Sequence, residues 1–412
     1  MLYFCTMSAF NVNLIRKDFP ILSEIVHGKP LIYFDNGATS QKPIQVIQRI
    51  TQYYGQENAN VHRGVHFLSD QATNAYEQAR TSVANYINAA HSQEVIFTKG
   101  TTDSINTVAF SVGETLKPGD EILISGMEQH SNIVPWQMLC ERKGTVLKVI
   151  PVTPEGTLDL AAFDTLLSER TKLLSIIHIS NTLGTINPVE QLIQKAHQFG
   201  AKVLLDAAQS IQHLPIDVQH LDCDFLAFSG HKVFGPTGIG ILYGKKDVLD
   251  SLPPYQGGGD MIEQVSFEKT TYNGLPLKFE AGTPNISGAI ALGAAFNYLS
   301  SIDLQGAFQH EHTLGNYLRE RMKEIPTMRF IGEAPETCGT LSFLIGELHP
   351  FDLGTLLDKQ GIAVRTGHHC TQPLMKQFNI PGTVRASLSF YNTTEEIDQF
   401  VVALERSIHL LS

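Results

Sequence analysis

Short apolar runs alternate with amphipathic stretches along most of the chain, and this alternation constrains the fold more than any other feature of the sequence. Each apolar run has the length of a buried strand, and the stretches between several of them have the pattern of helices. Strand–helix–strand alternation is typical of an α/β domain with a mostly parallel sheet. The expected strands are 31–34, 94–97, 121–125, 146–150, 173–180, 202–206, 225–228 and 239–243, and the expected helices include 43–56, 69–87, 104–111, 160–168 and 189–199.

Length and composition indicate a soluble protein of two domains. A chain of 412 residues with 42% hydrophobic residues can bury a sizeable core. We expect an N-terminal arm over residues 1–30 that packs on the small domain, a large domain over 31–287, and a small domain over 288–412. The 30 basic and 41 acidic residues give a net charge of −11, which argues against a nucleic-acid-binding surface.

The N-terminus and the cysteines bear on the cellular setting. No apolar run has membrane-spanning length, and the start, MLYFCTM, is too short for a secretion signal and lacks its basic residues. Either Met1 or Met7 can be the true start. The five cysteines are widely spread and form no CxxC pair, which argues against a disulfide framework and favours a reduced cytoplasm.

Lys232 lies in a loop between two apolar runs, 225–228 and 239–243. A lysine on a loop is usually a solvated surface charge. However, active sites of α/β folds lie at strand ends. A lysine held beside buried strands also loses hydration, so its pKa falls and its amine becomes nucleophilic. Lys232 is therefore a candidate to form a Schiff base with an aldehyde cofactor.

An acidic residue ends the apolar run that precedes this loop. Asp206 closes the run 202–206, about one strand–helix unit before the candidate lysine. Its ordinary role would be to cap a helix. A carboxylate at this place can also pair with the pyridinium N–H of pyridoxal phosphate, which keeps that cofactor an electron sink. Gln209, Ser229 and His231 complete the candidate cofactor site.

Three segments carry a family resemblance: 206–210 (DAAQS), 229–232 (SGHK) and 365–370 (RTGHHC). The chain resembles the aminotransferase class V branch of fold-type I pyridoxal phosphate enzymes, and most closely their SufS-type (group II) cysteine desulfurases. The likeness runs from about residue 18 to the end of the chain. It implies a homodimer in which each chain has a large, mostly parallel, seven-stranded-type sheet domain and a smaller α+β domain.

The resemblance also implies roles for residues along the chain. Thr101 and Thr102, between a strand and a helix, would bind the cofactor phosphate where unpaired amides and the helix dipole favour an anion. Asn181 would lie beside the ring hydroxyl and the substrate. Thr283 would be contributed to the phosphate site of the partner subunit. His62, otherwise a polar loop residue, would approach the cofactor or the substrate.

The sequence departs from the family pattern at one position. The residue after Glu128 is usually a histidine that stacks on the cofactor ring, whereas this chain has Gln129 there and His130 one place later. A glutamine amide is planar and can cover the ring, but it cannot act as an acid or a base. Either Gln129 stacks on the ring, which we favour, or the loop shifts and presents His130.

Cys370 follows two histidines near Arg365. Adjacent residues rarely bind one ion, so a zinc site is disfavoured, whereas a buried structural cysteine is a common alternative. The polar surroundings favour a thiolate, and the resemblance assigns Cys370 as the nucleophile that carries sulfur as a persulfide. Arg365 and Arg385 are either surface arginines or bidentate ligands of the substrate carboxylate, and the resemblance favours Arg385.

The implied activity is that of a cysteine desulfurase. With pyridoxal 5'-phosphate on Lys232, L-cysteine would yield L-alanine and a persulfide on Cys370, which would pass to an acceptor protein of SufE or SufU type for iron–sulfur cluster assembly. A selenocysteine lyase or a cysteine sulfinate desulfinase is the alternative on the same scaffold. A scaffold protein without chemistry, which Gln129 faintly supports, and a zinc-binding module are the alternatives of other classes.

Overall fold

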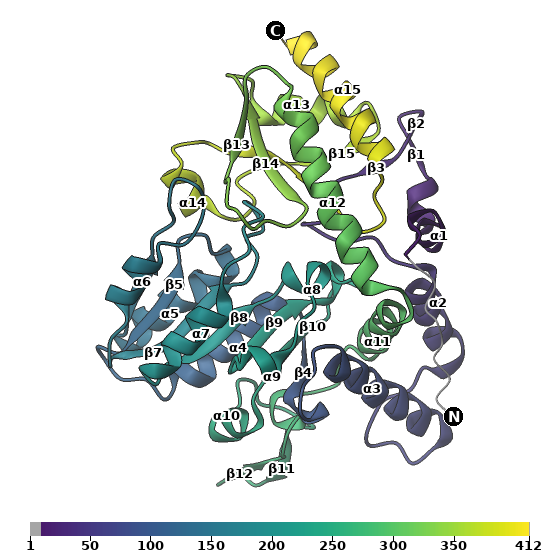
Figure 1. Cartoon of the computed structure of the whole chain (residues 1–412). Coiled ribbons are helices and arrows are strands. Elements are labelled where there is room, and N and C mark those ends of the chain that lie inside the picture. The colour runs from purple at the N-terminus through teal and green to yellow at the C-terminus, as the bar shows by residue number, and fades with distance from the viewer. Residues whose placement is uncertain (1–9, 412) are drawn as a thin grey trace, which may run out of the picture.

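The computed structural model describes residues 10–411 and divides into a larger, sheet-centred part and a smaller part (Figure 1). The strands of the large sheet are β4 (Val95–Thr98), β5 (Glu121–Ser125), β6 (Val146–Ile150), β7 (Thr171–Ile177), β8 (Lys202–Asp206), β9 (Phe225–Ser229) and β10 (Gly240–Gly244). They form a seven-stranded sheet in the order β4-β10-β9-β8-β7-β5-β6. The strands from β9 to β6 pair in parallel, and β10 pairs antiparallel with β4 and β9. The expected mostly parallel, seven-stranded sheet is confirmed.

The large sheet is buried on both faces, which explains why its strands read as continuous apolar runs. Successive side chains of a strand point to opposite faces. In β8, Val203 and Leu205 belong to the core that packs against α3 (Phe67–Tyr86), α7 (Val189–Gln198) and α11 (Ile286–Ser301). Leu204, between them, belongs to the core on the other face, with α4 (Thr101–Gly113), α5 (Val134–Lys143) and α10 (Lys246–Ser251).

The helices lie in the expected stretches, with small shifts at their ends. Helix α2 (Ile44–Gln52) continues as a π-helical turn over Tyr53–Glu57, and α6 covers Leu160–Leu166. The helix expected from residue 104 begins at Thr101, because Gly100 has a φ of 150° and lets the chain turn directly from β4 into α4. The strand expected over 173–180 ends at Ile177.

The smaller part is built on a four-stranded antiparallel sheet in the order β13-β14-β17-β16. Its strands are β13 (Met328–Ile331), β14 (Thr340–Ile345), β16 (Arg365–Gly367) and β17 (Thr383–Ser387), and its helices are α12 (Leu304–Lys323), α13 (Pro350–Asp358), α14 (Gln372–Gln377) and α15 (Thr394–Leu411). Residues of α12, α13 and α15 form one core with β14 and β17. This part corresponds to the green-to-yellow end of the chain in Figure 1.

The N-terminal segment runs along the smaller part. Strands β1 (Ile25–Val26) and β2 (Lys29–Pro30) form a hairpin, and β3 (Ile32–Tyr33) pairs in parallel with β15 (Ile362–Ala363). Arg16 forms an ion pair of 2.8 Å with Glu396 on α15. The alternative starts Met1 and Met7 lie outside the described residues.

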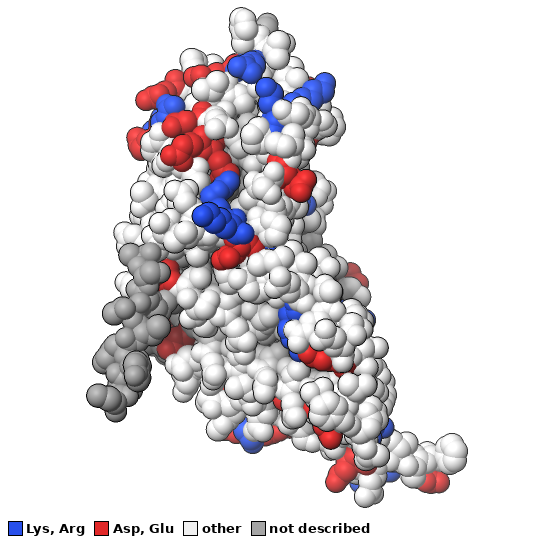
Figure 2. Space-filling model, turned by 90° about the vertical axis from the view of Figure 1, so that its right-hand side faces the viewer, with Lys and Arg blue, Asp and Glu red and all other residues white. Residues whose placement is uncertain are grey.

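A hairpin projects from the lower end of the larger part (Figure 1). Strands β11 (Ile262–Val265) and β12 (Thr270–Tyr272) form it. Among residues 10–411, no helix is both long and apolar enough to cross a membrane. On the face drawn in Figure 2, basic and acidic side chains lie intermixed near the end that carries α15, and much of the middle is uncharged.

Candidate functional site

Lys232 ends a short 3₁₀ turn, Gly230–Lys232, that directly follows β9. Its side chain is buried, with only 8% of the residue surface exposed. Burial lowers the pKa of the amine to about 8, and the positive charges of Arg385 and Arg365 act in the same direction. The negative charge of Asp206 opposes this shift. The amine therefore has the lowered pKa that a nucleophilic lysine needs.

The turn that carries Lys232 is fixed from outside by residues 39–42. The carbonyl oxygen of His231 accepts hydrogen bonds from the amide and the hydroxyl of Ser40 at 3.1 and 3.2 Å, the hydroxyl of Thr39 at 2.9 Å and the amine of Lys42 at 3.0 Å. Four donors on one carbonyl leave the peptide that precedes Lys232 little freedom. Lys232 is thus held on a fixed backbone.

Asp206 reaches the same edge of the sheet because β8 and β9 are adjacent and parallel. It is 1% exposed, and its Oδ1 accepts a hydrogen bond of 2.9 Å from the amide of Ala208. Burial raises the pKa of this carboxyl group, whereas the nearby charge of Lys232 lowers it. The structure therefore brings the candidate acid and the candidate lysine to neighbouring strand ends.

A cavity of about 530 Å³ lies at the start of α4. It brings together four of the predicted cofactor ligands, Thr101, Thr102, Ser229 and His231, with Gly100. The Oγ of Ser229 accepts a hydrogen bond of 2.8 Å from the amide of Thr101 and lies 2.8 Å from the Thr101 hydroxyl. Hydroxyl groups and helix amides around one cavity suit a phosphate group.

Asn181 and Gln209, the other predicted cofactor ligands at the strand ends, are also buried. The Nδ2 of Asn181 donates to the carbonyl of His369 at 2.8 Å, and its Oδ1 is buried without a hydrogen-bond partner among residues 10–411. The Nε2 of Gln209 donates to the carbonyl of Gly37 at 2.9 Å. The unpaired amide oxygen, the buried amine, the buried acid and the phosphate cradle together fit pyridoxal phosphate.

Cys370 lies in the turn after β16, at a half-buried position with a φ of 60°. Its amide donates to Nδ1 of His368 at 3.2 Å, and His369, which precedes it, also has a positive φ. The carbonyl of His369 accepts a hydrogen bond of 2.8 Å from the Nδ2 of Asn181, so the turn of Cys370 lies against the segment that follows β7. Among the described residues, no group of three or more His, Cys, Asp and Glu side chains is arranged to hold a metal ion.

Gln129 and His130 face different neighbours. The Oε1 of Gln129 accepts a hydrogen bond of 2.7 Å from the hydroxyl of Ser131. The amide of His130 donates to the carbonyl of Cys370 at 2.9 Å, and its Nε2 accepts from the amide of Gln372 at 3.3 Å. His130 is therefore engaged with the Cys370 turn, and the stacking of Gln129 on the cofactor ring stays a prediction.

The two candidate arginines are cross-strand partners, Arg365 on β16 and Arg385 on β17. Arg385 is 2% exposed and donates to the carbonyl of Asn181 at 2.8 Å and to Oδ1 of Asp35 at 3.0 Å. Arg365 is half-buried. The positive charge of each arginine lowers the pKa of Lys232.

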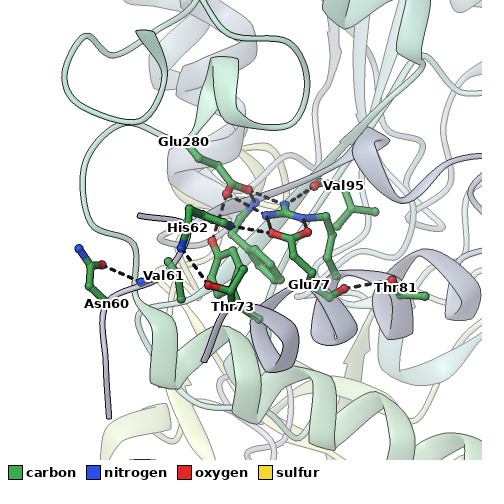
Figure 3. Close-up of polar contacts among 11 residues, drawn as sticks. Asn60, Val61, His62, Thr73, Glu77, Thr81, Val95 and Glu280 are labelled. Carbon is green, nitrogen blue, oxygen red and sulfur yellow. Dashed lines mark hydrogen bonds and ion pairs between the residues drawn. The ribbon is translucent and has the colours of Figure 1, made fainter. Parts of the chain in front are cut away.

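His62 and Thr283 lie in other surroundings. In Figure 3, His62 points toward Glu77, with Nε2 and Oε1 3.1 Å apart, and its amide donates to the hydroxyl of Thr73 at 2.9 Å. Thr283 lines a second cavity of about 420 Å³. That cavity shares Lys99, Asp103, Gly238 and Tyr255 with the cavity at the start of α4.

Asp35 and Lys42 are site residues that sequence reasoning missed. The segment 35–39 reads only as a turn-rich loop, yet its acid holds Arg385 and Lys42 holds the backbone beside Lys232. One signal was present: Asp35 directly follows a short apolar run, in the same position as Asp206.

The comparisons with known proteins identify the family of the chain. The aminotransferase class-V family model matches residues 32–400. A probable cysteine desulfurase of Synechocystis sp. is 50% identical over 402 residues, which cover 97% of this chain and 96% of the relative. A cysteine desulfurase of Synechococcus elongatus is 50% identical over 398 residues, 96% of this chain, and this chain spans only 64% of that relative's length.

A solved structure shares the whole fold. The apo structure of a cysteine desulfurase from Thermococcus onnurineus superposes with a TM-score of 0.92 at 41% identity, over 97% of this chain and 99% of that one. The family match covers most of the described residues and includes both strand ends that carry the acid and the lysine. The chain therefore belongs to the aminotransferase class-V family, among its members that are named cysteine desulfurases.

Proposed function

We propose that this protein is a cysteine desulfurase that takes sulfur from L-cysteine, releases L-alanine and holds the sulfur as a persulfide on Cys370. The observation that carries the proposal is that the turn of Cys370 is hydrogen-bonded to the edge of the large sheet where Lys232 is buried: the Nδ2 of Asn181, after β7, donates to the carbonyl of His369 at 2.8 Å. The similarity of full-length relatives named cysteine desulfurases supports the same activity.

Pyridoxal phosphate, when bound, supplies an electron sink for charge that develops at the substrate α-carbon. Thr101, Thr102, Ser229 and His231 would hold its phosphate, and Asp206 would hold the proton of its ring nitrogen. Asn181 and Gln209 would fix the ring from the strand ends, and Gln129 would cover it. These residue sets are the predicted ones, and the cavity and the buried unpaired Oδ1 of Asn181 support them.

Lys232 would hold the cofactor and then move the proton at the substrate α-carbon. With a pKa of about 8, a substantial fraction of this amine is unprotonated slightly above neutral pH. Arg385 and Arg365 would bind the substrate carboxylate with parallel N–H donors, beside Asn181. The substrate would then lie between the amine and the thiol.

The Cys370 thiolate would attack the sulfur of L-cysteine. A sulfur–sulfur bond forms as the carbon–sulfur bond of the substrate breaks, and the electron pair of the broken bond stays with the three-carbon fragment. That fragment takes up protons and leaves as L-alanine, and the enzyme keeps one additional sulfur atom. No external oxidant or reductant is needed.

We also propose that the protein is of the SufS type and passes sulfur to an acceptor protein of SufE or SufU type in the cytoplasm, for iron–sulfur cluster assembly. The segment 365–370 has no added run of small residues, and the half-buried Cys370 supports delivery to a docking acceptor. The same proposal divides the chain into an arm (1–30), a large domain (31–287) and a small domain (288–412), although buried residues of α11 (Ile286–Ser301) pack in the core of the large sheet.

A homodimer is part of the same proposal. Val65, Phe67 and Phe267 are large apolar side chains that are at least 71% exposed in the single chain. An ion pair of 2.5 Å between Arg63 and Asp260 ties the loop before α3 to the segment that leads into the hairpin. These exposed side chains would be covered by a second copy, which would bring Thr283 and His62 to the site of the partner subunit.

The test is to incubate the purified protein with L-cysteine and to quantify alanine and protein-bound persulfide. We expect alanine from the wild type, and less than about 1% of that rate after Cys370→Ser. Cys140→Ser, a half-buried cysteine on α5, is the matched control and should keep the wild-type rate. Full activity of Cys370→Ser would overturn the nucleophile assignment.

Two further measurements separate the alternatives. Lys232→Ala should lose the yellow absorbance of the wild type, whereas a scaffold protein without chemistry would show no such absorbance in either form. Turnover of L-selenocysteine or cysteine sulfinate well above that of L-cysteine would favour the selenocysteine lyase or the desulfinase instead.

A further inference from the structure

Asp35 is held in a fixed position between the two parts of the chain. It follows β3, and its backbone forms an isolated parallel bridge with Ser387 at the end of β17. Its carbonyl accepts hydrogen bonds from the amides of Ala38 at 3.0 Å and Thr39 at 3.3 Å, which close the turn after it. The main chain that carries this carboxylate is therefore fixed.

This carboxylate engages Arg385, the arginine proposed to bind the substrate. The Oδ1 of Asp35 accepts from NH2 of Arg385 at 3.0 Å, and the two side chains are 24% and 2% exposed, respectively. Another donor, NH1, reaches the carbonyl of Asn181, and the Nε of Arg385 is buried without a partner among residues 10–411. The guanidinium group thus keeps free N–H donors next to the one that Asp35 takes.

The charges around Asp35 are those that an incoming carboxylate would meet. Burial raises the pKa of Asp35, and Arg385, Arg365 and Lys232 all act to lower it. A buried arginine without an anion would be strongly destabilising, so one carboxylate is needed to balance Arg385. The same negative charge, however, repels a second carboxylate that approaches the same guanidinium group.

We propose that Asp35 sets the affinity of the substrate site: its carboxylate occupies Arg385 and competes with the carboxylate of the amino acid for that guanidinium group. Substrate and product are therefore held more weakly than the two arginines alone would hold them, which favours release of the product. This inference rests on the proposed role of Arg385 in binding the substrate.

The test compares wild type with Asp35→Asn. Asparagine keeps an oxygen that can accept from Arg385, but it removes the charge. The probe is propanoate, which has the carboxylate and the carbon chain of alanine but no amine, so it cannot react with the cofactor. Calorimetry on the cofactor-loaded enzyme should show propanoate binding at least about fivefold tighter to Asp35→Asn, and the KM for L-cysteine should fall without a rise in kcat.

Two further variants serve as controls. Asp352→Asn removes the same charge from an exposed position on α13 and should leave propanoate affinity unchanged. Asp35→Ser also removes the charge, and it replaces Asp35→Asn in the propanoate titration if the asparagine variant folds poorly. Propanoate affinity that is equal to or weaker than wild type in the charge-free variants would overturn the competition and leave Asp35 only a support for Arg385.

A separate experiment tests whether Arg385 binds the substrate carboxylate at all. Arg385→Gln should abolish propanoate binding in an otherwise wild-type protein. If propanoate binds Arg385→Gln as well as it binds the wild type, Arg385 is not the carboxylate ligand. That result would reject the proposed role of Arg385, and the inference about Asp35 would be rejected with it. Unchanged or weaker binding in the Asp35 variants alone would reject only the inference about Asp35.

Discussion

The amide of His130 donates a hydrogen bond of 2.9 Å to the carbonyl oxygen of Cys370. The ring of the same histidine accepts from the amide of Gln372, so one residue of the loop after β5 holds both sides of the turn that carries the thiol. Burial and the neighbouring His368 lower the pKa of His130, which favours the neutral ring that this acceptor role requires. The amide and the ring of His130 are therefore both occupied by the turn of Cys370. Gln129, the residue before it, is the one whose side chain can cover the cofactor ring.

Replacing Gln129 by histidine should therefore add an ionisable group over the cofactor rather than duplicate one. We expect Gln129→His to keep the cofactor absorbance. The pH profile of alanine formation should gain an ionisation near about 6.5, with a rate change of about tenfold across it. Gln129→Asn, which stays unable to ionise, is the control. Superimposable pH profiles for wild type and Gln129→His would contradict the predicted place of this side chain.

The buried amine of Lys232 should lower the stability of the cofactor-free protein at neutral pH. Its folded pKa of about 8 lies below the ordinary value of 10.5, so below pH 8 the fold must carry a buried charge that the unfolded chain carries in water. This destabilisation is complete below about pH 8 and disappears as the pH rises toward 10.5. We expect Lys232→Met to gain about 3 kcal/mol in urea unfolding at pH 7, and much less at pH 10. Lys359→Met, at an exposed position, should show no such pH-dependent gain.

The alternation of apolar runs was enough to predict the large sheet because both faces of that sheet are buried. Val203, Leu204 and Leu205 enter two different cores, so every residue of such a strand must be apolar. Asp206 and Lys232 could be found for a related reason: Asp206 ends one such run, Lys232 lies in the turn after the next, and adjacent parallel strands bring these ends together.

Contacts between the two parts of the chain could not be predicted in this way. Asp35 meets Arg385 only because β3 leaves the N-terminal segment to pair with β15, and no local pattern encodes that pairing. His62 adopts a φ of 69°, which is uncommon for a residue other than glycine, and its partner Glu77 lies on the following helix. Both contacts depend on the assembled tertiary structure rather than on neighbours in the sequence.

Arg80 is the buried partner of two acids that Figure 3 labels, Glu77 and Glu280. It is 1% exposed and forms ion pairs with Glu280 at 2.6 Å and Glu77 at 2.9 Å, and Glu280 also accepts from the hydroxyl of Tyr76. Removing one partner leaves a buried carboxylate uncompensated, so Arg80→Met should lose about 3–5 kcal/mol of unfolding free energy. Urea unfolding would measure this loss.

Two comparisons show whether the loss of stability comes from the unpaired charge. Arg80→Met combined with Glu280→Gln should recover part of the lost stability, because the second change removes the buried negative charge. Arg321→Met, which breaks the more exposed pairs with Asp398 and Glu324, should change stability by no more than about 1 kcal/mol. If the double variant is as unstable as the two single losses added together, charge compensation is not the reason.

Gly240 should be intolerant of any side chain, because it begins β10 directly against the turn that precedes the phosphate cradle. A Cβ at this position would lie 2.4 Å from Cα of Gly100 and 2.7 Å from the carbonyl oxygen of Phe228, and both are backbone atoms that cannot swing away. The start of α4 would have to move, so we expect Gly240→Ala to bind pyridoxal phosphate at least about tenfold more weakly and to lose about 3 kcal/mol of stability. Gly55→Ala, where no atom lies within 4 Å of the added Cβ, is the control. Wild-type cofactor affinity in Gly240→Ala, measured by absorbance titration of the cofactor-free protein, would show that the cradle does not depend on this close contact.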